Sequence, residues 1–408
     1  MIINFINGGV CAPKGFKASG IHCGIRKNQT KKDLALIVSE NICSAAAVYT
    51  QNLVKGAPIH VTKENISDGK AQCFICNSGN ANTCNANGIE IAEGMCSLVE
   101  QFTGIDAKNV IVASTGVIGQ PLSLAPIAAG MDELVSLLGD KDENSDAAAR
   151  SIMTTDTVKK EVAVSFEING VQCRMGGISK GSGMIHPNMA TMLAFITTDA
   201  AISPQMLQKA IKEDVSDTFN MLSIDGDTST NDMLSVLANG MAGNEEISAE
   251  GVAFEAFKKA LNAVTGRLCR MMAKDGEGAT KLLECKTVGA KDKLTAKTVA
   301  KSVVCSTLLK AAIFGSDANW GRVLCAIGYS GADLDINKID VSFLSAAGTV
   351  NVCKNGSGVD FSEEIAKKVL SEDEITVFVN LNSGDHEAVA WGCDLTYDYV
   401  KINGDYRT

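Results

Sequence analysis

An alternation of apolar strands and amphipathic helices between residues 71 and 139 is the feature that most restricts the fold. The run Ala71–Asn77 predicts a strand, and a helix is predicted from about Thr83 to Phe102 because its apolar residues fall on one face. The apolar strand Asn109–Ala113 follows, and a second helix over 127–138 ends at Gly139. Strand–helix alternation of this kind indicates a layer of α/β structure.

A β-hairpin is predicted over residues 160–176. Apolar and polar or small residues alternate along both of its arms, and Asn169-Gly170 has the composition of a two-residue hairpin turn. The hairpin leads directly into the Gly-rich stretch KGSGMIHPNMATMLAF, residues 180–195.

Other elements follow from the same patterns. Residues 225–232, DGDTSTND, form a polar loop whose acidic spacing is not that of an EF-hand. The remaining predicted elements are strands at Leu34–Ser39, Ala45–Tyr49, Met192–Thr197, Asp340–Leu344, Ile375–Leu381 and Val389–Tyr399, and helices that begin after Ser203 and Ser362 or cover Phe254–Met271 and about Val299–Leu309. No internal repeat and no linker of low complexity marks a domain boundary.

Composition and charge exclude several classes of protein. The 408 residues, 46% of them hydrophobic and 21% charged, are typical of a globular protein with a large core and two or three domain-sized units. The net charge of −10 argues against binding to nucleic acid or to an anionic membrane. The N-terminal sequence lacks the pattern of a signal peptide, and no run of about 18 apolar residues occurs, so we expect a cytoplasmic protein without a membrane span.

The 14 cysteines are expected to be reduced residues of the core, because most lie in apolar runs. Cys73 and Cys76 form a C-x-x-C motif, but they lie in a predicted strand. Their spacing puts them on opposite faces of that strand, and no second Cys or His pair completes a zinc site. The sequence therefore predicts no metal.

The Gly-rich stretch contains a candidate nucleophile, Thr191, preceded by Ala190. A threonine hydroxyl needs a base, and the four histidines of the chain are not spaced as in a catalytic triad. A threonine at a new N-terminus would carry its own base, since an α-amine has a pKa of about 7.7–8.0. The small Ala190 side chain leaves its carbonyl accessible, and Gly181 and Gly183 permit an unusual backbone upstream. We therefore hypothesise that the chain cleaves itself between Ala190 and Thr191.

Two other interpretations of this stretch stay open on the residues alone. Residues 192–196 could be an ordinary buried strand, in which the Ala-Thr pair has no special role. Lys180-Gly181-Ser182 also resembles the end of a phosphate-binding loop, but the glycine that such a loop needs five residues before its lysine is replaced by Met175.

Several motifs in a fixed order give the chain a resemblance to a known family. Besides the stretch around Thr191, they are Asn77–Asn85, Ser114–Gly119, Met153–Asp156, Asp275–Lys281, Asp317–Arg322 and a C-terminal tail. Over its whole length the chain resembles the ornithine acetyltransferase family, also called bifunctional glutamate N-acetyltransferase, of arginine biosynthesis. The resemblance implies an α/β fold of two units with mixed sheets packed with helices.

The resemblance also implies how the chain is processed and which residues form the site. Cleavage would give an α chain, 1–190, and a β chain, 191–408, that assemble as an α2β2 heterotetramer. Thr191 would be the nucleophile, and Thr115 and Gly116 would form the oxyanion hole. The implied substrate contacts are Thr154, Lys180, Thr191, Glu277, Asn403 and Thr408. Judged by local sequence alone, these positions would be turns, a surface lysine, a loop carboxylate and a chain terminus.

The activity implied is acetyl transfer from N2-acetylornithine to glutamate through an acetyl-Thr191 ester, without a metal or an organic cofactor. Whether acetyl-CoA also serves as donor is left open by the sequence. One alternative is an amidase or aminopeptidase that shares the self-processing chemistry, with water as acceptor. Another is a non-catalytic protein that uses its Gly-rich loops to bind a small anion.

Overall fold

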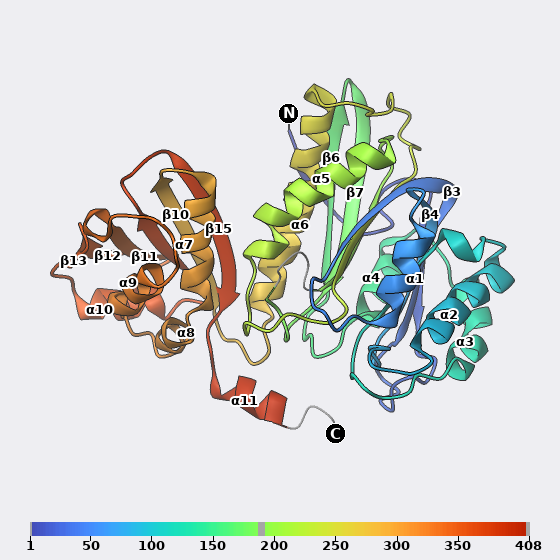
Figure 1. Cartoon of the computed structure of the whole chain (residues 1–408), viewed down its shortest axis with the longest axis horizontal. Helices are drawn as coiled ribbons and strands as arrows, with labels where there is room; N and C mark the ends of the chain where they lie inside the picture. The colour runs from blue at the N-terminus through green and yellow to red at the C-terminus, as the bar shows by residue number, and fades with distance from the viewer. Residues whose placement is uncertain (1, 187–191, 405–408) are drawn as a thin grey trace. The chain divides into compact units, whose positions relative to one another are not determined.

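The computed structural model describes residues 2–186 and 192–404. Three positions singled out above, Ala190, Thr191 and Thr408, lie outside the described residues. The chain forms two compact units (Figure 1). The first contains the chain up to Gly181 together with residues 192–219 and 228–268, and the second contains 182–186, 220–227 and the chain from Cys269 onward.

The first unit is built on a nine-stranded mixed sheet with the order β1-β6-β7-β8-β9-β3-β4-β5, in which β2 also pairs with β3. The pairs β4/β5 and β8/β9 are parallel and the others are antiparallel. Its strands are β1 (Asn4–Ile6), β2 (Phe16–Ile21), β3 (Leu34–Tyr49), β4 (Lys70–Asn77), β5 (Val110–Ser114), β6 (Lys160–Ile168), β7 (Val171–Lys180), β8 (Leu193–Thr198) and β9 (Met233–Ala238).

Helices pack on both faces of this sheet. They are α1 (Ala57–Asn65), α2 (Gly88–Thr103), α3 (Ala125–Ser136), α4 (Asp142–Ser151), α5 (Pro204–Asp217) and α6 (Val252–Lys274), with a short 3-10 turn at Ala107–Asn109. The end of α6, from Cys269 onward, belongs to the second unit, and a 3-10 turn at Phe219–Met221 lies where the chain passes from the first unit to the second. Strand β4 shows the two faces clearly, because Cys76 lies in the apolar cluster that contains Phe195, whereas Cys73 lies in the cluster that contains Met95. The prediction that the two cysteines occupy opposite faces of one strand is confirmed.

The second unit contains a six-stranded mixed sheet with the order β13-β12-β11-β14-β10-β15. Its strands are β10 (Leu282–Ala290), β11 (Asp340–Ser345), β12 (Gly348–Lys354), β13 (Ser357–Gly358), β14 (Glu374–Asn380) and β15 (His386–Cys393). Its helices are α7 (Lys293–Cys305), α8 (Thr307–Phe314), α9 (Trp320–Gly328), α10 (Glu363–Leu370) and α11 (Tyr397–Gly404), with a 3-10 turn at Ile336–Lys338. The buried face of α7 supplies Ala296, Val299, Ala300 and Val303 to the core of this unit.

The two units confirm the expected fold class, which is α/β with two mixed sheets packed with helices. Local signals located several elements well. The hairpin β6–β7 turns at Asn169 and Gly170, whose φ angles are 49° and 84°, as a type I′ turn requires. Ser203 and Ser362 cap helices as predicted, accepting hydrogen bonds from the backbone N–H groups of Met206 and Ile365.

Other predictions of elements were wrong. The two strands expected at 34–39 and 45–49 are one strand, β3, whose pairing with β4 shifts register between Val38 and Cys43. The helix expected around 299–309 is two helices, because Ser306 ends α7 and caps α8. The strand expected at 389–399 ends at Cys393, and α11 follows. Within the described part of the chain, no helix combines the length and the apolar character needed to cross a bilayer.

Candidate functional site

The loop after β5 presents two hydrogen-bond donors that nothing in the described chain uses. The Thr115 N–H donates to the Asn77 carbonyl at 3.0 Å, which fixes the backbone, but neither the Thr115 hydroxyl nor the Gly116 N–H has a partner in residues 2–186 and 192–404. Gly116 has a φ of 133°, and a Cβ there would overlap the backbone of Gly79 and Asn80. Only glycine fits this position, and the loop offers the pair of donors that an oxyanion hole requires.

A buried carboxamide ties this loop to the middle of the sheet. The Asn231 Nδ2 atom donates to the Ser114 carbonyl at 3.0 Å and to the Ala81 carbonyl at 2.6 Å, while Thr83 donates to the Asn231 Oδ1 atom at 2.6 Å. Asn231 lies just before β9, and the N–H of Met233 donates to the Met192 carbonyl at 2.7 Å. The loop that carries Thr115 and Gly116 is therefore held beside the N-terminal end of β8.

Lys180 lies on the other side of that strand end. It pairs in register with Leu193 across the β7–β8 ladder and is only 8% exposed. Lys180 is therefore not the solvated surface lysine that the local sequence suggests. A buried ammonium needs negative charge nearby, and the Asp156 carboxylate supplies it, while a second acidic residue, Asp232, lies close enough to interact with Lys180.

Asp156 is the first of these residues. Its Oδ1 atom accepts hydrogen bonds from the Lys160 ammonium at 2.5 Å and from the Gly181 N–H at 2.8 Å, and its Oδ2 atom accepts from the Thr154 N–H at 2.9 Å. Burial alone would raise the pKa of Asp156, but the charges of Lys160 and Lys180 and these hydrogen bonds hold it below its usual range. One carboxylate thus joins the Thr154 turn to the segment that carries Lys180.

Removing the Asp156 charge should destabilise the fold strongly. Asp156→Asn would leave Lys160, 1% exposed, without its counter-charge, which we expect to cost about 3–5 kcal/mol of unfolding free energy at pH 7. Because the folded pKa is lowered, the stabilisation is present above the unfolded pKa of about 3.9 and is lost as pH falls further. Urea unfolding from pH 7 to pH 3 measures the difference.

The matched control for this prediction is Asp146→Asn. Asp146 pairs with Arg150 and Lys159 where its side chain is 30% exposed, so we expect a loss of about 0–1 kcal/mol. Equal losses in the two variants would contradict the role given to Asp156.

Asp232 is the second acidic residue near Lys180. Burial raises its pKa well above the ordinary value, although hydrogen bonds from the side chains of Ser229 and Thr50, the charge of Lys180 and the Met192 N–H act in the opposite direction. Its Oδ2 atom is buried without a hydrogen-bond partner among residues 2–186 and 192–404. A buried acidic side chain that has a raised pKa and an oxygen without a hydrogen-bond partner is typical of a functional position.

The second unit contains another group of site residues. The Glu277 carboxylate is buried, and the Asn403 Nδ2 atom of α11 donates to its Oε2 atom at 2.7 Å. The Glu277 N–H donates to the Ser182 carbonyl at 2.8 Å, which places the Gly-rich segment against it. The structure therefore brings Glu277 and Asn403 together, and the chain returns here at its C-terminal helix.

Gly183 leaves no room for a side chain beside Glu277, because a Cβ there would overlap the carboxylate. We therefore expect Gly183→Ala to displace the Glu277 carboxylate and to weaken the contact with a charged substrate group that the family resemblance implies for Glu277. A charge-assisted hydrogen bond is worth about 1.5–3 kcal/mol, so KM for the amino-acid substrate should rise about 10- to 150-fold. Steady-state kinetics measures the change in KM.

Gly266→Ala is the control, since a Cβ at Gly266 in α6 meets nothing within 4 Å. Its kinetic constants should match those of the wild type. An unchanged KM in Gly183→Ala would show that Glu277 does not contact the substrate.

Sequence analysis missed Asp156, Asn231 and Asp232 as members of the site. Asp156 was part of the motif Met153–Asp156 but was given no role. Residues 225–232, which include Asn231, were assigned only to a polar loop. The run of hydrogen-bonding residues directly before the apolar strand β9 is a pattern that could have indicated Asn231 and Asp232, but no such pattern marks Asp156. Their partners are distant in sequence, however, so the roles needed the fold.

No metal site accompanies these residues. Within residues 2–186 and 192–404, no three His, Cys, Asp or Glu side chains gather as metal ligands would. The groups described are hydroxyls, amides, carboxylates and ammonium groups, which can bind an amino acid and stabilise an oxyanion.

Comparisons with known proteins agree with this chemistry. The family model described as ArgJ matches residues 17–408. A relative named arginine biosynthesis bifunctional protein ArgJ, from Caldanaerobacter subterraneus subsp. tengcongensis, is 50% identical over 407 residues, 100% of both chains. Another relative with this name, from Bacillus subtilis, is 45% identical over 405 residues, 99% of this chain and 97% of its own.

Solved structures of similar chains include an ornithine acetyltransferase from Mycobacterium tuberculosis in complex with ornithine. It is 32% identical and covers 46% of this chain and 100% of its own, with a TM-score of 0.42.

Proposed function

The chain belongs to the ArgJ family, and we propose that it moves the acetyl group of N2-acetylornithine to glutamate. It is an acyltransferase of arginine biosynthesis. The observation that carries the proposal is the pair of unused donors on Thr115 and Gly116, held by Asn231 beside the strand that begins two residues after Thr191.

The first step we propose is self-cleavage. The Thr191 hydroxyl attacks the Ala190 carbonyl, and the acyl group moves from the Thr191 nitrogen to its Oγ atom. Water then hydrolyses this ester, which leaves the Ala190 carboxylate and a free Thr191 α-amine. That amine, with a pKa of about 7.7–8.0, can take the proton of its own hydroxyl.

Acetyl transfer then follows in two half-reactions. Thr191 Oγ attacks the acetyl carbonyl of N2-acetylornithine, and Thr115 and Gly116 donate to the oxyanion of the tetrahedral intermediate. The C–N bond breaks, ornithine leaves with the proton, and an acetyl-Thr191 ester remains. The amine of glutamate attacks this ester to give N-acetylglutamate and restores the Thr191 hydroxyl.

The substrate contacts follow from charge. In the proposal, Lys180 faces a substrate carboxylate and Thr154 provides a polar contact. Glu277, oriented by Asn403, faces a substrate amino group, and Thr408 adds a contact from the C-terminus. The proposal includes cytoplasmic α (1–190) and β (191–408) chains in an α2β2 assembly, with acetyl-CoA as a possible second donor.

The kinetic pattern tests this mechanism. Initial rates with N2-acetylornithine and glutamate varied together should give parallel double-reciprocal lines, because ornithine leaves before glutamate reacts. Incubation with labelled N2-acetylornithine alone should leave about one acetyl group on each β chain.

Intersecting lines without a labelled β chain would contradict the acetyl-enzyme. Release of free acetate in place of N-acetylglutamate would instead favour the amidase alternative.

A further inference from the structure

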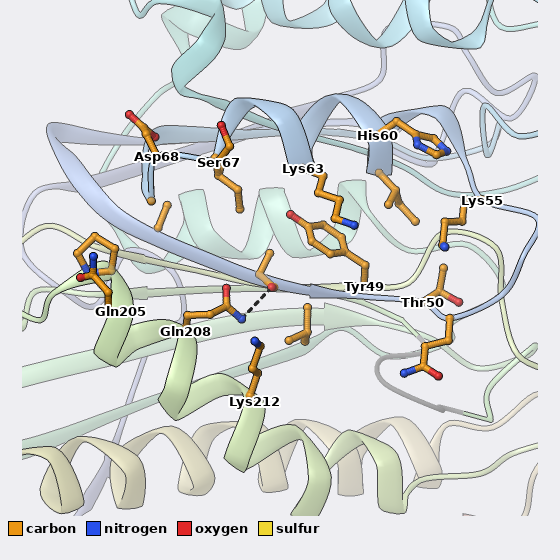
Figure 2. A pocket seen from close by; sticks show the side chains of 18 residues that line it. Tyr49, Thr50, Lys55, His60, Lys63, Ser67, Asp68, Gln205, Gln208 and Lys212 are labelled. Atoms are coloured by element: carbon orange, nitrogen blue, oxygen red, sulfur yellow. Dashed lines mark hydrogen bonds between the residues drawn. The ribbon is translucent and has the colours of Figure 1, made fainter. Parts of the chain in front are cut away.

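A pocket of about 870 Å³ lies in the first unit, bordered by β3, α1 and α5 (Figure 2). Pockets of roughly 300–1,000 Å³ are those that hold small organic ligands. None of the residues assigned above to cleavage, the oxyanion hole or substrate binding lines it. The proposed transferase mechanism therefore leaves this pocket without a role.

The charged residues that line the pocket are mostly cationic. Lys55 precedes α1, Lys63 lies in its last turn and Lys212 lies on α5, with His60 on the same helix as Lys63 (Figure 2). None of these side chains has an ion-pair or hydrogen-bond partner within residues 2–186 and 192–404. In a chain of net charge −10, unpaired ammonium groups from separate elements around one pocket indicate an anionic ligand.

Among the described residues that line the pocket, Asp68 is the only one with a carboxylate. Asp68 lies at the far end of the pocket from Lys55 in Figure 2, and its Oδ1 atom accepts a hydrogen bond from the Lys70 N–H at 3.0 Å. The end that carries Lys55 and His60 has no acidic residue among its lining residues. The positive field is thus concentrated between α1 and α5.

The floor of the pocket is apolar. It is formed by Ala45, Ala47 and Val48 of β3 together with Ile59 and Ile66. Apolar lining residues can bury the uncharged part of a ligand. A ligand that suits both the floor and the rim therefore combines an apolar body with several negative charges.

The walls of the pocket are fixed in position. Gln208 of α5 donates from Nε2 to the Ala47 carbonyl at 3.2 Å, which anchors that helix to β3. Gly69, with a φ of 78°, closes the end near α5, where a Cβ would overlap Pro204. The pocket is therefore formed before a ligand binds.

We propose that this pocket binds a phosphorylated small molecule with an apolar body, a nucleotide in chemical class. Its phosphate groups contact Lys55, Lys63 and Lys212, and its base lies on the apolar floor that includes residues of β3. Phosphate suits this rim because lysine binds it as a point charge, and several charges are needed to offset three ammonium groups.

Isothermal titration of the full-length protein with ATP, tripolyphosphate, adenosine and citrate tests the proposal. We expect ATP to bind once per chain and to bind more tightly than tripolyphosphate, which lacks the ring, adenosine, which lacks the charge, and citrate, which lacks phosphate. The double variant Lys63→Gln/Lys212→Gln should weaken ATP at least about tenfold, and higher salt should weaken it further.

The control is Lys17→Gln/Lys141→Gln, which removes two exposed lysines outside the pocket. Its affinity for ATP should be that of the wild type, and thermal unfolding checks that all variants fold. The absence of saturable binding, equal weakening by both double variants, or citrate binding as tightly as ATP would overturn the proposal. None of these outcomes depends on acetyl transfer, so the test stands apart from that of the proposed function.

Discussion

Thr191→Ala is expected to yield a single polypeptide of 42.8 kDa that has lost acetyl transfer almost completely. The variant lacks the hydroxyl that would break the bond to Ala190, so the α-amine that serves as base is never released. Removing the nucleophile of an enzyme that works through a covalent intermediate lowers kcat by about 10⁶-fold. Denaturing electrophoresis and the transfer assay measure both effects on one preparation.

The matched control is Thr191→Ser, which keeps a hydroxyl at the same position. It should still cleave and should transfer acetyl groups, more slowly than the wild type. N-terminal sequencing of the β fragment, residues 191–408, should find Thr-Met-Leu-Ala in the wild type and Ser-Met-Leu-Ala in this variant. A fully active wild-type preparation that contains only the intact chain would contradict the mechanism at its first step.

Local sequence was sufficient where the structure depends on neighbours in the chain. The Asn169-Gly170 turn and the caps at Ser203 and Ser362 need only residues within four positions of each other, and all three are where we predicted them. The break at Ser306 uses the same capping chemistry, but it interrupts an apolar run. Periodicity alone could not separate one helix from two.

The site required contacts that no local pattern encodes. Asn231 acts through carbonyls 117 and 150 positions away in sequence, and Asp156 binds a backbone N–H 25 positions away. Motif resemblance supplied Thr115, Lys180 and Glu277, because it compares whole chains. The resemblance did not explain why these residues are buried. The neighbouring carboxylates and carboxamides in the structure explain it.

The C-terminal end of the chain illustrates the same limit. Periodicity predicted a strand through Tyr399, but the strand ends at Cys393 and the chain forms α11, which places Asn403 against Glu277. The family resemblance implied that Asn403 contacts the substrate. In the structure Asn403 donates a hydrogen bond to Glu277, which gives it a physical role as the residue that orients this carboxylate. Long-range pairing overrode the local pattern here.

Thr115→Ala is expected to lower kcat by about 10²–10³-fold with little change in KM, the effect of removing one oxyanion donor. The Thr115 hydroxyl has no partner in the described chain, so its loss should leave the fold intact, whereas the charge on the acetyl oxygen develops only in the transition state. Steady-state kinetics measures kcat and KM, and urea unfolding checks stability.

A merely structural role for Thr115 would give a different set of results. Thr115→Ser keeps the donor and should restore most of kcat, while Thr115→Ala should slow self-cleavage as well, if the same oxyanion hole serves the carbonyl of Ala190. A loss of stability in proportion to the loss of rate, or a kcat equal to that of the wild type, would remove Thr115 from the mechanism. The Gly116 N–H would then be left as a single donor, and one donor accounts for only about 2.7–4 kcal/mol of transition-state stabilisation.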